Sequence, residues 1–141
     1  MWMLFIVINL AMNEIRLIII EEHTAVRDAL KVRLESSVNL EVVAVYGSAA
    51  DWKACQQEKE SKADVVLLGL KSVRQRPLTT VIRDIKEFSE SGVAVLVLAS
   101  LADDVEKELV LQAGARRYLL KDINSNQLIA EIEALAPSHI Y

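Results

Sequence analysis

Residues 15–45, IRLIIIEEHTAVRDALKVRLESSVNLEVVAV, contain two short apolar runs on either side of a longer amphipathic stretch. The first run, residues 15–20, is continuous and rich in isoleucine, which is typical of a strand that is buried on both faces. Residues 24–35 carry apolar side chains at helical spacing, and we expect Thr24 to cap this helix. The second run, residues 40–45, is again suited to a strand. This stretch therefore predicts a strand, a helix and a second strand parallel to the first.

The same alternation continues through the rest of the chain. Each further apolar run is short enough for a strand, and these runs are residues 63–68, 93–98 and 117–120. The amphipathic stretches predict helices at residues 48–60, 78–89, 103–113 and 124–136. The residues that stand where helix caps are expected are Ser48, Asp103 and Asn124. Five strands that alternate with five helices predict a parallel sheet with helices on both faces.

A single domain accounts for most of the 141 residues. We place it at residues 13–136, with a short tail at residues 137–141. Residues 1–12 form an uncharged apolar extension that is shorter than the roughly 20 apolar residues needed to span a bilayer. Three interpretations of the extension stay open: a segment upstream of a true start at Met12, an arm that docks on the domain or on a partner, or an anchor on a membrane surface.

The composition narrows the class of protein. The formal net charge is −4 and the lysines and arginines do not cluster, so we expect no nucleic-acid binding within this chain. Cys55 is the only cysteine, which excludes an internal disulfide and a cysteine-based zinc site. We therefore expect a cytoplasmic protein that has no membrane partner.

The residues that follow the predicted strands are the candidates for a functional site, because parallel sheets bind ligands at the carboxyl ends of their strands. These residues are Glu21, Glu22, Gly69, Ala99, Ser100 and Lys121. The two glutamates are either site residues or solvated loop acids. Lys121 is expected either to pair with one of them or to be solvated.

Five segments give the chain a resemblance to a known family. They are IRLIIIEEH at residues 15–23, NLEVVAVYGSAADW at 39–52, ADVVLLGL at 63–70, AVLVLAS at 94–100 and GARRYLLKD at 114–122. Over residues 15–135 the sequence resembles the receiver domains of bacterial response regulators, which act in two-component phosphorelay signal transduction, and it is most similar to the NarL type. The resemblance implies a doubly wound, flavodoxin- and CheY-like α/β fold whose five parallel strands have the order 2-1-3-4-5.

The resemblance also implies a phosphorylation site, and this chain lacks part of it. In the family, an aspartate at the end of the third strand accepts a phosphoryl group from a histidine kinase, and a hydroxyl residue after the fourth strand contacts that group. Gly69 occupies the phosphoacceptor position here, and Ala99 occupies the hydroxyl position. Ser100 stands one residue later, where alternation along a strand points its side chain away. The chain therefore resembles a degenerate receiver, a pseudo-receiver without the phosphoacceptor aspartate.

Other positions of the family site are retained. Two acidic residues after the first strand help to hold Mg²⁺ in the family, and Glu21 and Glu22 take their places with longer side chains. Lys121 matches the lysine that contacts the phosphoryl group. Tyr118 matches the aromatic residue that changes rotamer, and its alternative role is that of a packed strand aromatic. Because one carboxylate of the usual three is missing, we expect no cofactor, and weak Mg²⁺ binding by the two glutamates is the alternative.

These losses predict a function without catalysis. We expect a phosphorylation-independent signalling module, not an enzyme, that acts by binding a protein partner. Receivers of the family commonly form dimers through a face that here comprises residues 103–113, 117–120 and 124–136, so a homodimer through this face is one expected assembly. The predicted surface residues of the face are Glu106, Lys107, Arg116, Tyr118 and Gln127.

Two alternatives use different chemistry. The first is a working phosphotransfer receiver with a non-standard acceptor, for which the candidates are Asp64, Asp103 and Asp122. Asp64 is at the wrong end of its strand, and the other two belong to neighbouring loops. The second alternative is a ligand- or nucleotide-binding domain on a flavodoxin-like fold. The negative charge of Glu21 and Glu22 disfavours it, because that charge repels phosphate.

Overall fold

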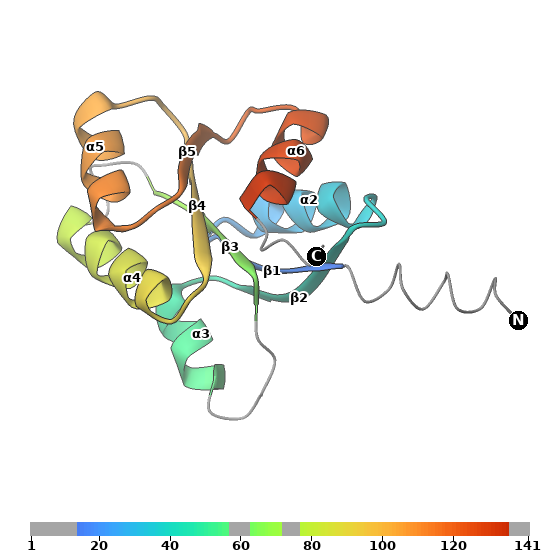
Figure 1. The fold of residues 1–141 in the computed structure, drawn as a ribbon, viewed down its shortest axis with the longest axis horizontal. Helices are drawn as coiled ribbons and strands as arrows, with labels where there is room; N and C mark the ends of the chain where they lie inside the picture. The colour runs from blue at the N-terminus through green and yellow to red at the C-terminus, as the bar shows by residue number, and fades with distance from the viewer. Residues whose placement is uncertain (1–13, 57–62, 72–76, 136–141) are drawn as a thin grey trace, which may run out of the picture.

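The computed structural model describes residues 14–56, 63–71 and 77–135. Within these residues, five parallel strands form one sheet with the order β2-β1-β3-β4-β5 (Figure 1). The strands are β1 (Ile15–Ile20), β2 (Leu40–Tyr46), β3 (Val65–Gly69), β4 (Ala94–Ala99) and β5 (Arg117–Leu120). The predicted α/β fold and the strand order that the resemblance implied are confirmed.

Five helices of the described residues connect and cover these strands. They are α2 (Thr24–Glu35), α3 (Ala49–Gln56), α4 (Leu78–Glu90), α5 (Asp104–Ala113) and α6 (Ser125–Leu135). Helices α2 and α6 lie on one face of the sheet, and α3, α4 and α5 lie on the other (Figure 1). This doubly wound arrangement buries both faces of the central strands, which explains their continuous apolar sequences.

The sheet separates two apolar cores. Phe88 of α4 packs in the core on the α3, α4 and α5 side, and Ile132 of α6 packs in the core on the α2 and α6 side. All five residues of β3 are buried because helices cover both faces of this strand. Neighbouring side chains along a strand point to opposite faces, so Val66 contributes to the first core and Leu67 to the second.

The helix caps test the local predictions. Three predicted caps accept a hydrogen bond from an amide three residues later, at 2.8–3.1 Å, and they are Ser48, Asp103 and Asn124. The predicted Thr24 cap is wrong, because Thr24 is the first residue of α2 and His23 stands at the cap position without a side-chain cap hydrogen bond. The chain turns one residue earlier than expected, where the His23 amide donates to a carboxylate oxygen of Glu21 (2.9 Å).

Most other predicted boundaries agree with the structure to within two residues. Strand β3 begins at Val65, two residues later than predicted, and ends at Gly69. Parts of the prediction lie outside the described residues: the apolar extension at 1–12, the end of the helix at 48–60, the last residue of the helix at 124–136, and the tail at 137–141. Among the described helices, none is long and apolar enough to cross a bilayer.

Candidate functional site

The carboxyl ends of three strands bring three of the predicted site residues together. Glu21 follows β1, Gly69 is the last residue of β3, and Lys121 follows β5. Strand β4 lies between β3 and β5, yet the Lys121 ammonium lies 2.7 Å from Oε1 of Glu21. The expected pairing of Lys121 with one of the two glutamates is therefore confirmed. We call Glu21, Gly69 and Lys121 the crevice residues.

Glu21 is a buried residue, so its interpretation as a solvated loop acid is wrong. It is 3% exposed, and its amide continues the sheet by donating to the carbonyl of Tyr46 (2.9 Å). Its carboxylate oxygen Oε2 accepts a hydrogen bond from the His23 amide (2.9 Å). Its carbonyl accepts another from the Arg27 guanidinium (3.0 Å). These backbone and side-chain contacts hold Glu21 in a defined position at the end of β1.

The ion pair with Lys121 is the contact made by the buried Oε1 of Glu21. Oε1 lies 2.7 Å from Nζ of Lys121. No other group of the described residues donates a hydrogen bond to Oε1. An unsatisfied buried acceptor costs about 1–3 kcal/mol, so the opposite charge of Lys121 is what stabilises the carboxylate here.

Gly69 provides the space in which the Glu21 carboxylate lies. A Cβ atom added at Gly69 would collide with Oε1 of Glu21, while the next backbone atom, the Ile20 carbonyl oxygen, would be at an ordinary contact distance of 3.5 Å. The need for glycine does not come from the backbone conformation, because the described glycines with positive φ are Gly92 and Gly114. The absence of a side chain at Gly69 and the position of the Glu21 carboxylate are therefore two parts of one arrangement.

Glu22 points to a different partner from Glu21. Its Oε1 lies 2.7 Å from the ammonium of Lys71, and both side chains are partly open to solvent. Each glutamate of the acidic pair thus has its own lysine. The described residues contain no group of three or more His, Cys, Asp or Glu side chains placed to hold a metal ion. As arranged here, the pair does not fit Mg²⁺, which requires several oxygen ligands at 2.0–2.1 Å in near-octahedral geometry.

The end of β4 adds no hydroxyl group to the crevice. Ala99 is 2% exposed, and its carbonyl accepts a hydrogen bond from the Lys121 amide (2.8 Å). Ser100, the next residue, is exposed and lies beyond the strand. The structure therefore places the two residues differently, with Ala99 at the crevice and Ser100 toward solvent.

Tyr118 of β5 forms a hydrogen bond with α5. Its hydroxyl donates to a carboxylate oxygen of Glu106 (2.7 Å) and lies 3.4 Å from the carbonyl oxygen of Leu101. Burial, followed by the hydrogen bond to Glu106, raises the pKa of Tyr118 above its ordinary value. The ring is thus fixed at its polar end, which is a more specific role than that of a packed strand aromatic.

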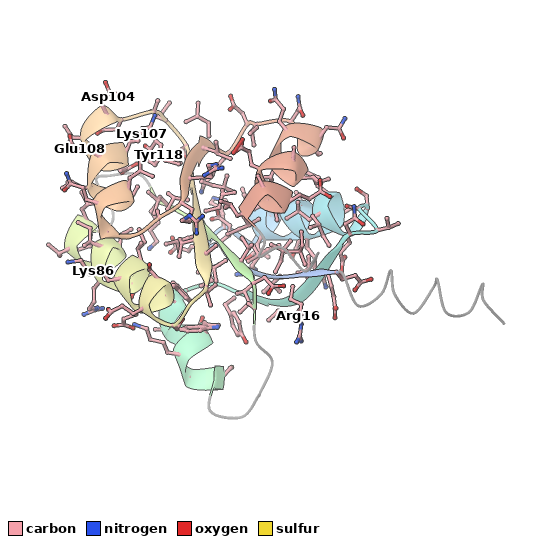
Figure 2. The ribbon with its side chains drawn as sticks, in the orientation of Figure 1. Arg16, Lys86, Asp104, Lys107, Glu108 and Tyr118 are labelled. Atoms are coloured by element: carbon pink, nitrogen blue, oxygen red, sulfur yellow. The ribbon has the colours of Figure 1, made fainter. Side chains whose placement is uncertain are left out.

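The predicted interaction face is only partly exposed. Glu106 is 6% exposed and serves as the acceptor for Tyr118, so its prediction as a surface residue is wrong. Lys107, Arg116 and Gln127 are exposed, as predicted. Lys107 projects from α5 on the side of the molecule where Tyr118 lies (Figure 2). The exposed polar part of the face is therefore smaller than the sequence indicated.

None of the three aspartates proposed as alternative acceptors is a crevice residue. Asp64 precedes β3, at the opposite end of that strand, and its side chain accepts a hydrogen bond from the Arg16 amide (2.9 Å). Asp103 caps α5. Asp122 is exposed in the loop after β5. None of the three carboxylates takes the place that an aspartate at Gly69 would occupy.

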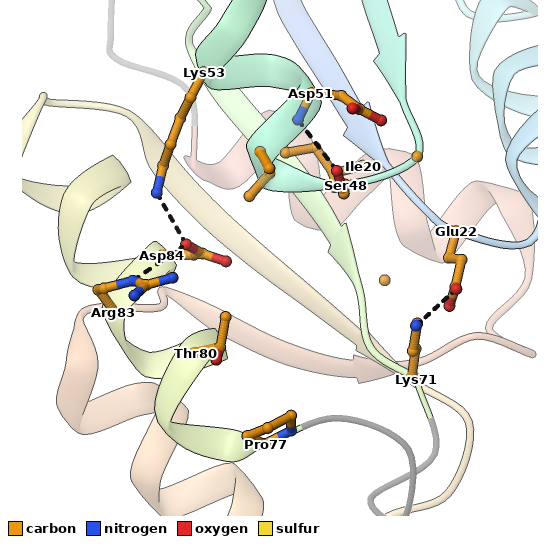
Figure 3. A pocket seen from close by; sticks show the side chains of 14 residues that line it. Ile20, Glu22, Ser48, Asp51, Lys53, Lys71, Pro77, Thr80, Arg83 and Asp84 are labelled. Atoms are coloured by element: carbon orange, nitrogen blue, oxygen red, sulfur yellow. Dashed lines mark hydrogen bonds and ion pairs between the residues drawn. The ribbon is translucent and has the colours of Figure 1, made fainter.

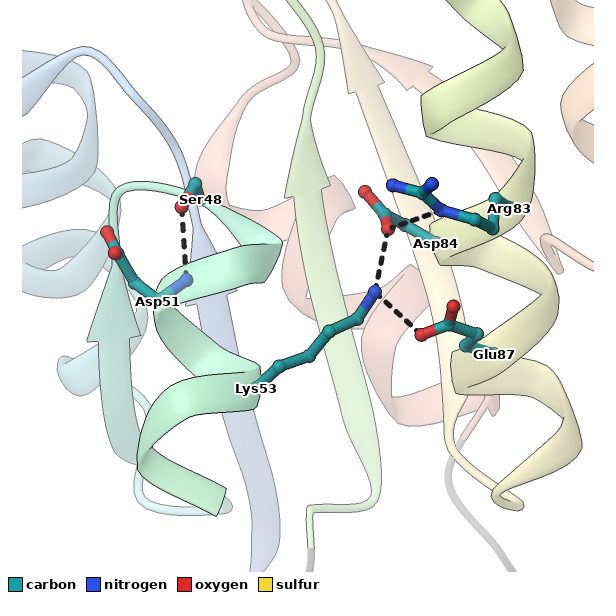
Figure 4. A network of polar contacts seen from close by, with 6 residues as sticks. All are labelled: Ser48, Asp51, Lys53, Arg83, Asp84 and Glu87. Atoms are coloured by element: carbon teal, nitrogen blue, oxygen red, sulfur yellow. Dashed lines mark hydrogen bonds and ion pairs between the residues drawn. The ribbon is translucent and has the colours of Figure 1, made fainter. Parts of the chain in front are cut away.

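Sequence reasoning missed a charged contact between α3 and α4. Nζ of Lys53 lies 3.1 Å from Oδ1 of Asp84 and 2.6 Å from Oε2 of Glu87 (Figure 4). Hydrogen bonding to Glu87 is the largest cause that raises the pKa of Lys53. Asp84 is 3% exposed and lies on the buried face of α4 between Val81 and Phe88. A charged residue in an apolar helical stripe is the signal that indicates such a contact.

A cavity of about 570 Å³ opens beside the crevice, between the start of α3, the end of β3 and the first turns of α4 (Figure 3). Its lining residues are Ile20, Glu22, Gly47, Ser48, Ala49, Ala50, Asp51, Lys53, Gly69, Lys71, Pro77, Thr80, Arg83 and Asp84. Three of these side chains are basic and three are acidic, so the described walls have no net formal charge.

Comparison with known proteins gives a consistent family. Residues 17–133 match the response regulator receiver domain family. The transcriptional regulatory protein LiaR of Bacillus subtilis is 30% identical over 121 residues, which cover 85% of this chain and 55% of LiaR. The transcriptional regulatory protein YhcZ of the same species is 28% identical over 114 residues, covering 81% of this chain and 51% of YhcZ. The chain thus spans about half the length of these curated relatives.

Solved structures show the same fold. The signal receiver domain of NarL from Mycobacterium tuberculosis matches with a TM-score of 0.71 at 18% identity, covering 87% of this chain and 97% of that one. The response regulator domain of CheB from Thermotoga maritima matches with a TM-score of 0.69, also at 18% identity, covering 86% of this chain and 96% of that one. At these identities the likeness is one of fold alone.

Proposed function

This chain belongs to the response regulator receiver domain family, and from that membership we propose that it is an atypical receiver that signals without phosphorylation, by binding another protein. Receiver domains are generally non-enzymatic signalling domains, so the proposal assigns no catalytic residue. The single observation that carries it is the crevice: Gly69 has no side chain, and the buried Glu21 carboxylate lies over it in an ion pair with Lys121.

Phosphorylation at a receiver aspartate requires a carboxylate nucleophile that a phosphodonor can reach. The family resemblance places that aspartate at Gly69. Glu21 supplies a carboxylate nearby, but it is 3% exposed, one oxygen faces Lys121, and the other accepts the His23 amide. The crevice residues therefore offer no free carboxylate that could attack a phosphodonor. We further propose that the crevice binds no Mg²⁺, since both acidic residues are paired with lysines.

The partner-binding part of the proposal rests on the surface near α5. Among the described residues, five large hydrophobic side chains are exposed, and three of them lie on α5 or in the loop before it: Leu101, Val105 and Leu111. Val105 and Leu111 fall within the residue ranges of the face that the sequence indicated, and Leu101 precedes them. We propose that the face binds a second copy of this chain. A cytoplasmic location is part of the same proposal and fits the unpaired thiol of Cys55.

The proposal is tested by incubating the protein with acetyl phosphate and Mg²⁺ and measuring its intact mass. We expect no gain in mass, because no accessible carboxylate stands at the end of β3. A receiver domain that gains one phosphoryl group under the same conditions is the positive control. A stoichiometric, hydroxylamine-labile gain of one phosphoryl group in this protein would contradict the proposal. Peptide mapping would then decide whether Glu21, Asp64, Asp103 or Asp122 is the acceptor.

A further inference from the structure

We propose that the Glu21 carboxylate is a resident occupant of the crevice, which fills the space over Gly69 and neutralises Lys121, so that the crevice is held in one state without a metal ion or a phosphoryl group. The carboxylate that Lys121 contacts is supplied from β1 instead of from β3. This inference rests on the proposed function, because a crevice held in one state has a role only in a receiver that signals without phosphorylation. The contact between Glu21 and Lys121 does not depend on that function.

The first argument is steric. A Cβ atom at Gly69 would come too close to both Oε1 and Cδ of Glu21, and the remaining neighbour, the Ile20 carbonyl oxygen, leaves room. The side chain of Glu21 is thus the group that stands in the way of any larger residue. As the side chains lie here, the carboxylate of Glu21 takes the space over Gly69, so a side chain at position 69 would require that carboxylate to move.

The second argument is electrostatic. The side chain of Glu21 is 4% exposed and that of Lys121 is 19% exposed, so each charge has lost most of its hydration. A buried charge without its partner is strongly destabilising. If the carboxylate left its place, it would give up both Lys121 and the His23 amide. Separating Glu21 from Lys121 would leave each buried charge without its partner, and the free-energy cost of that separation maintains the contact.

Together these arguments make residues 21 and 69 a coupled pair. Glu22, the neighbouring acid, is not part of the pair because its carboxylate turns to Lys71 (2.7 Å). The coupling predicts that the effect of adding a methyl group at Gly69 depends on whether the Glu21 carboxylate is present. The presence of the Glu22 carboxylate should make no difference to that effect.

The test is a set of thermal unfolding measurements on Gly69→Ala in three backgrounds. In the wild-type background we expect Gly69→Ala to lower the unfolding midpoint, since the methyl group displaces the carboxylate from Lys121. In the Glu21→Ala background the same change should leave the midpoint unchanged or raise it, because alanine has less freedom than glycine in the unfolded chain. In the Glu22→Ala background, the matched control, the midpoint should fall as it does in the wild type.

An equal effect of Gly69→Ala in all three backgrounds would overturn the inference, as would a midpoint that does not fall in the wild-type background. If Glu21→Ala does not fold, Glu21→Asp provides the same comparison, because its carboxylate is one methylene shorter and ends farther from position 69. The measurement reports on the contact between Glu21 and Gly69, whereas the acetyl phosphate assay reports on phosphorylation. The inference and the proposed function can therefore fail independently.

Discussion

The hydroxyl of Tyr118 joins β5 to α5 through one short hydrogen bond. It donates to Glu106 (2.7 Å), a carboxylate that is itself 6% exposed, so each group satisfies the other in a partly buried place. Neither residue would be well placed alone, because a buried polar group without a partner is costly. The pair therefore fixes the ring of Tyr118 and the first turns of α5 relative to each other.

The raised pKa of Tyr118 predicts how stability changes in alkali. The unfolded chain loses the phenol proton near pH 10, whereas the folded chain keeps it to higher pH. The contribution of Tyr118 is therefore complete below pH 10 and is lost as the pH rises above it. We expect Tyr118→Phe to lower the free energy of unfolding by about 1–3 kcal/mol at neutral pH, because Glu106 loses its donor.

The alkaline slope gives the sharper measurement. Above pH 10, wild-type stability should fall more steeply than that of Tyr118→Phe, by up to about 1.4 kcal/mol per pH unit for the one proton that only the folded state retains. Urea unfolding at a series of pH values measures both slopes. Parallel slopes for the two proteins would show that the phenol pKa is not raised by folding. The raised pKa values of Lys53 and Tyr46 contribute equally to both proteins and cancel in the comparison.

Helices α3 and α4 contact each other through one apolar and one charged interaction. The rings of Trp52 and Phe88 have centroids 4.4 Å apart, and the next residue of α3, Lys53, reaches Asp84 and Glu87 (Figure 4). Trp52 belongs to the apolar core on this face of the sheet and is 8% exposed. Because α3 is short, its position depends on these side chains more than on its own helix propensity.

The two kinds of contact should differ in energy. We expect Phe88→Ala to lower the free energy of unfolding by about 3–5 kcal/mol, because it removes a fully buried ring and leaves a cavity beside Trp52. Glu87→Gln, at the adjacent position, should cost less than about 1 kcal/mol, because that side chain is 45% exposed and its ion pair is screened by water. Denaturant unfolding of the two variants measures the difference, and similar losses would contradict this account.

The molecule exposes its large apolar side chains unevenly. Helix α5 lies at an outer edge of the fold (Figure 1). Val105 is 68% exposed on this helix, and Leu101 is 80% exposed in the loop before it. On the opposite face of the sheet, Val32 of α2 is 70% exposed. The next exposed large apolar residue in the sequence is Val38. Single exposed apolar residues are ordinary on protein surfaces, whereas neighbouring ones indicate an interaction site.

If α5 belongs to the interface of a homodimer, a charge placed there should weaken self-association. We expect Val105→Asp to shift the protein from dimer to monomer in sedimentation velocity experiments, because a carboxylate would be desolvated in the interface. Val32→Asp is the matched control, since Val32 is similarly exposed but lies on α2. The proposed face would be wrong if only Val32→Asp weakened the dimer, and the proposed homodimer would be wrong if the wild type sedimented as a monomer.

The local elements of this protein follow from its sequence because they depend on near neighbours. The continuous apolar run at 15–20 and the helical spacing at 24–35 already specify β1 and α2, since side-chain period decides which face an element buries. The absence of a side chain at Gly69 is likewise a local fact. Contacts between distant segments depend on the strand order, which places the ends of β1 and β3 side by side.

The tertiary structure alone decided which glutamate pairs with Lys121 and which charged side chains are buried. Glu21 and Gly69 are far apart in the sequence, and only packing shows that the carboxylate of one lies in the space left by the other. The same holds for Glu106, which the family resemblance placed on an interaction surface but which is 6% exposed and accepts the hydrogen bond of Tyr118. The physical reason is that side-chain period is a property of adjacent residues, whereas burial and ion pairing depend on distances between elements that the folded sheet sets.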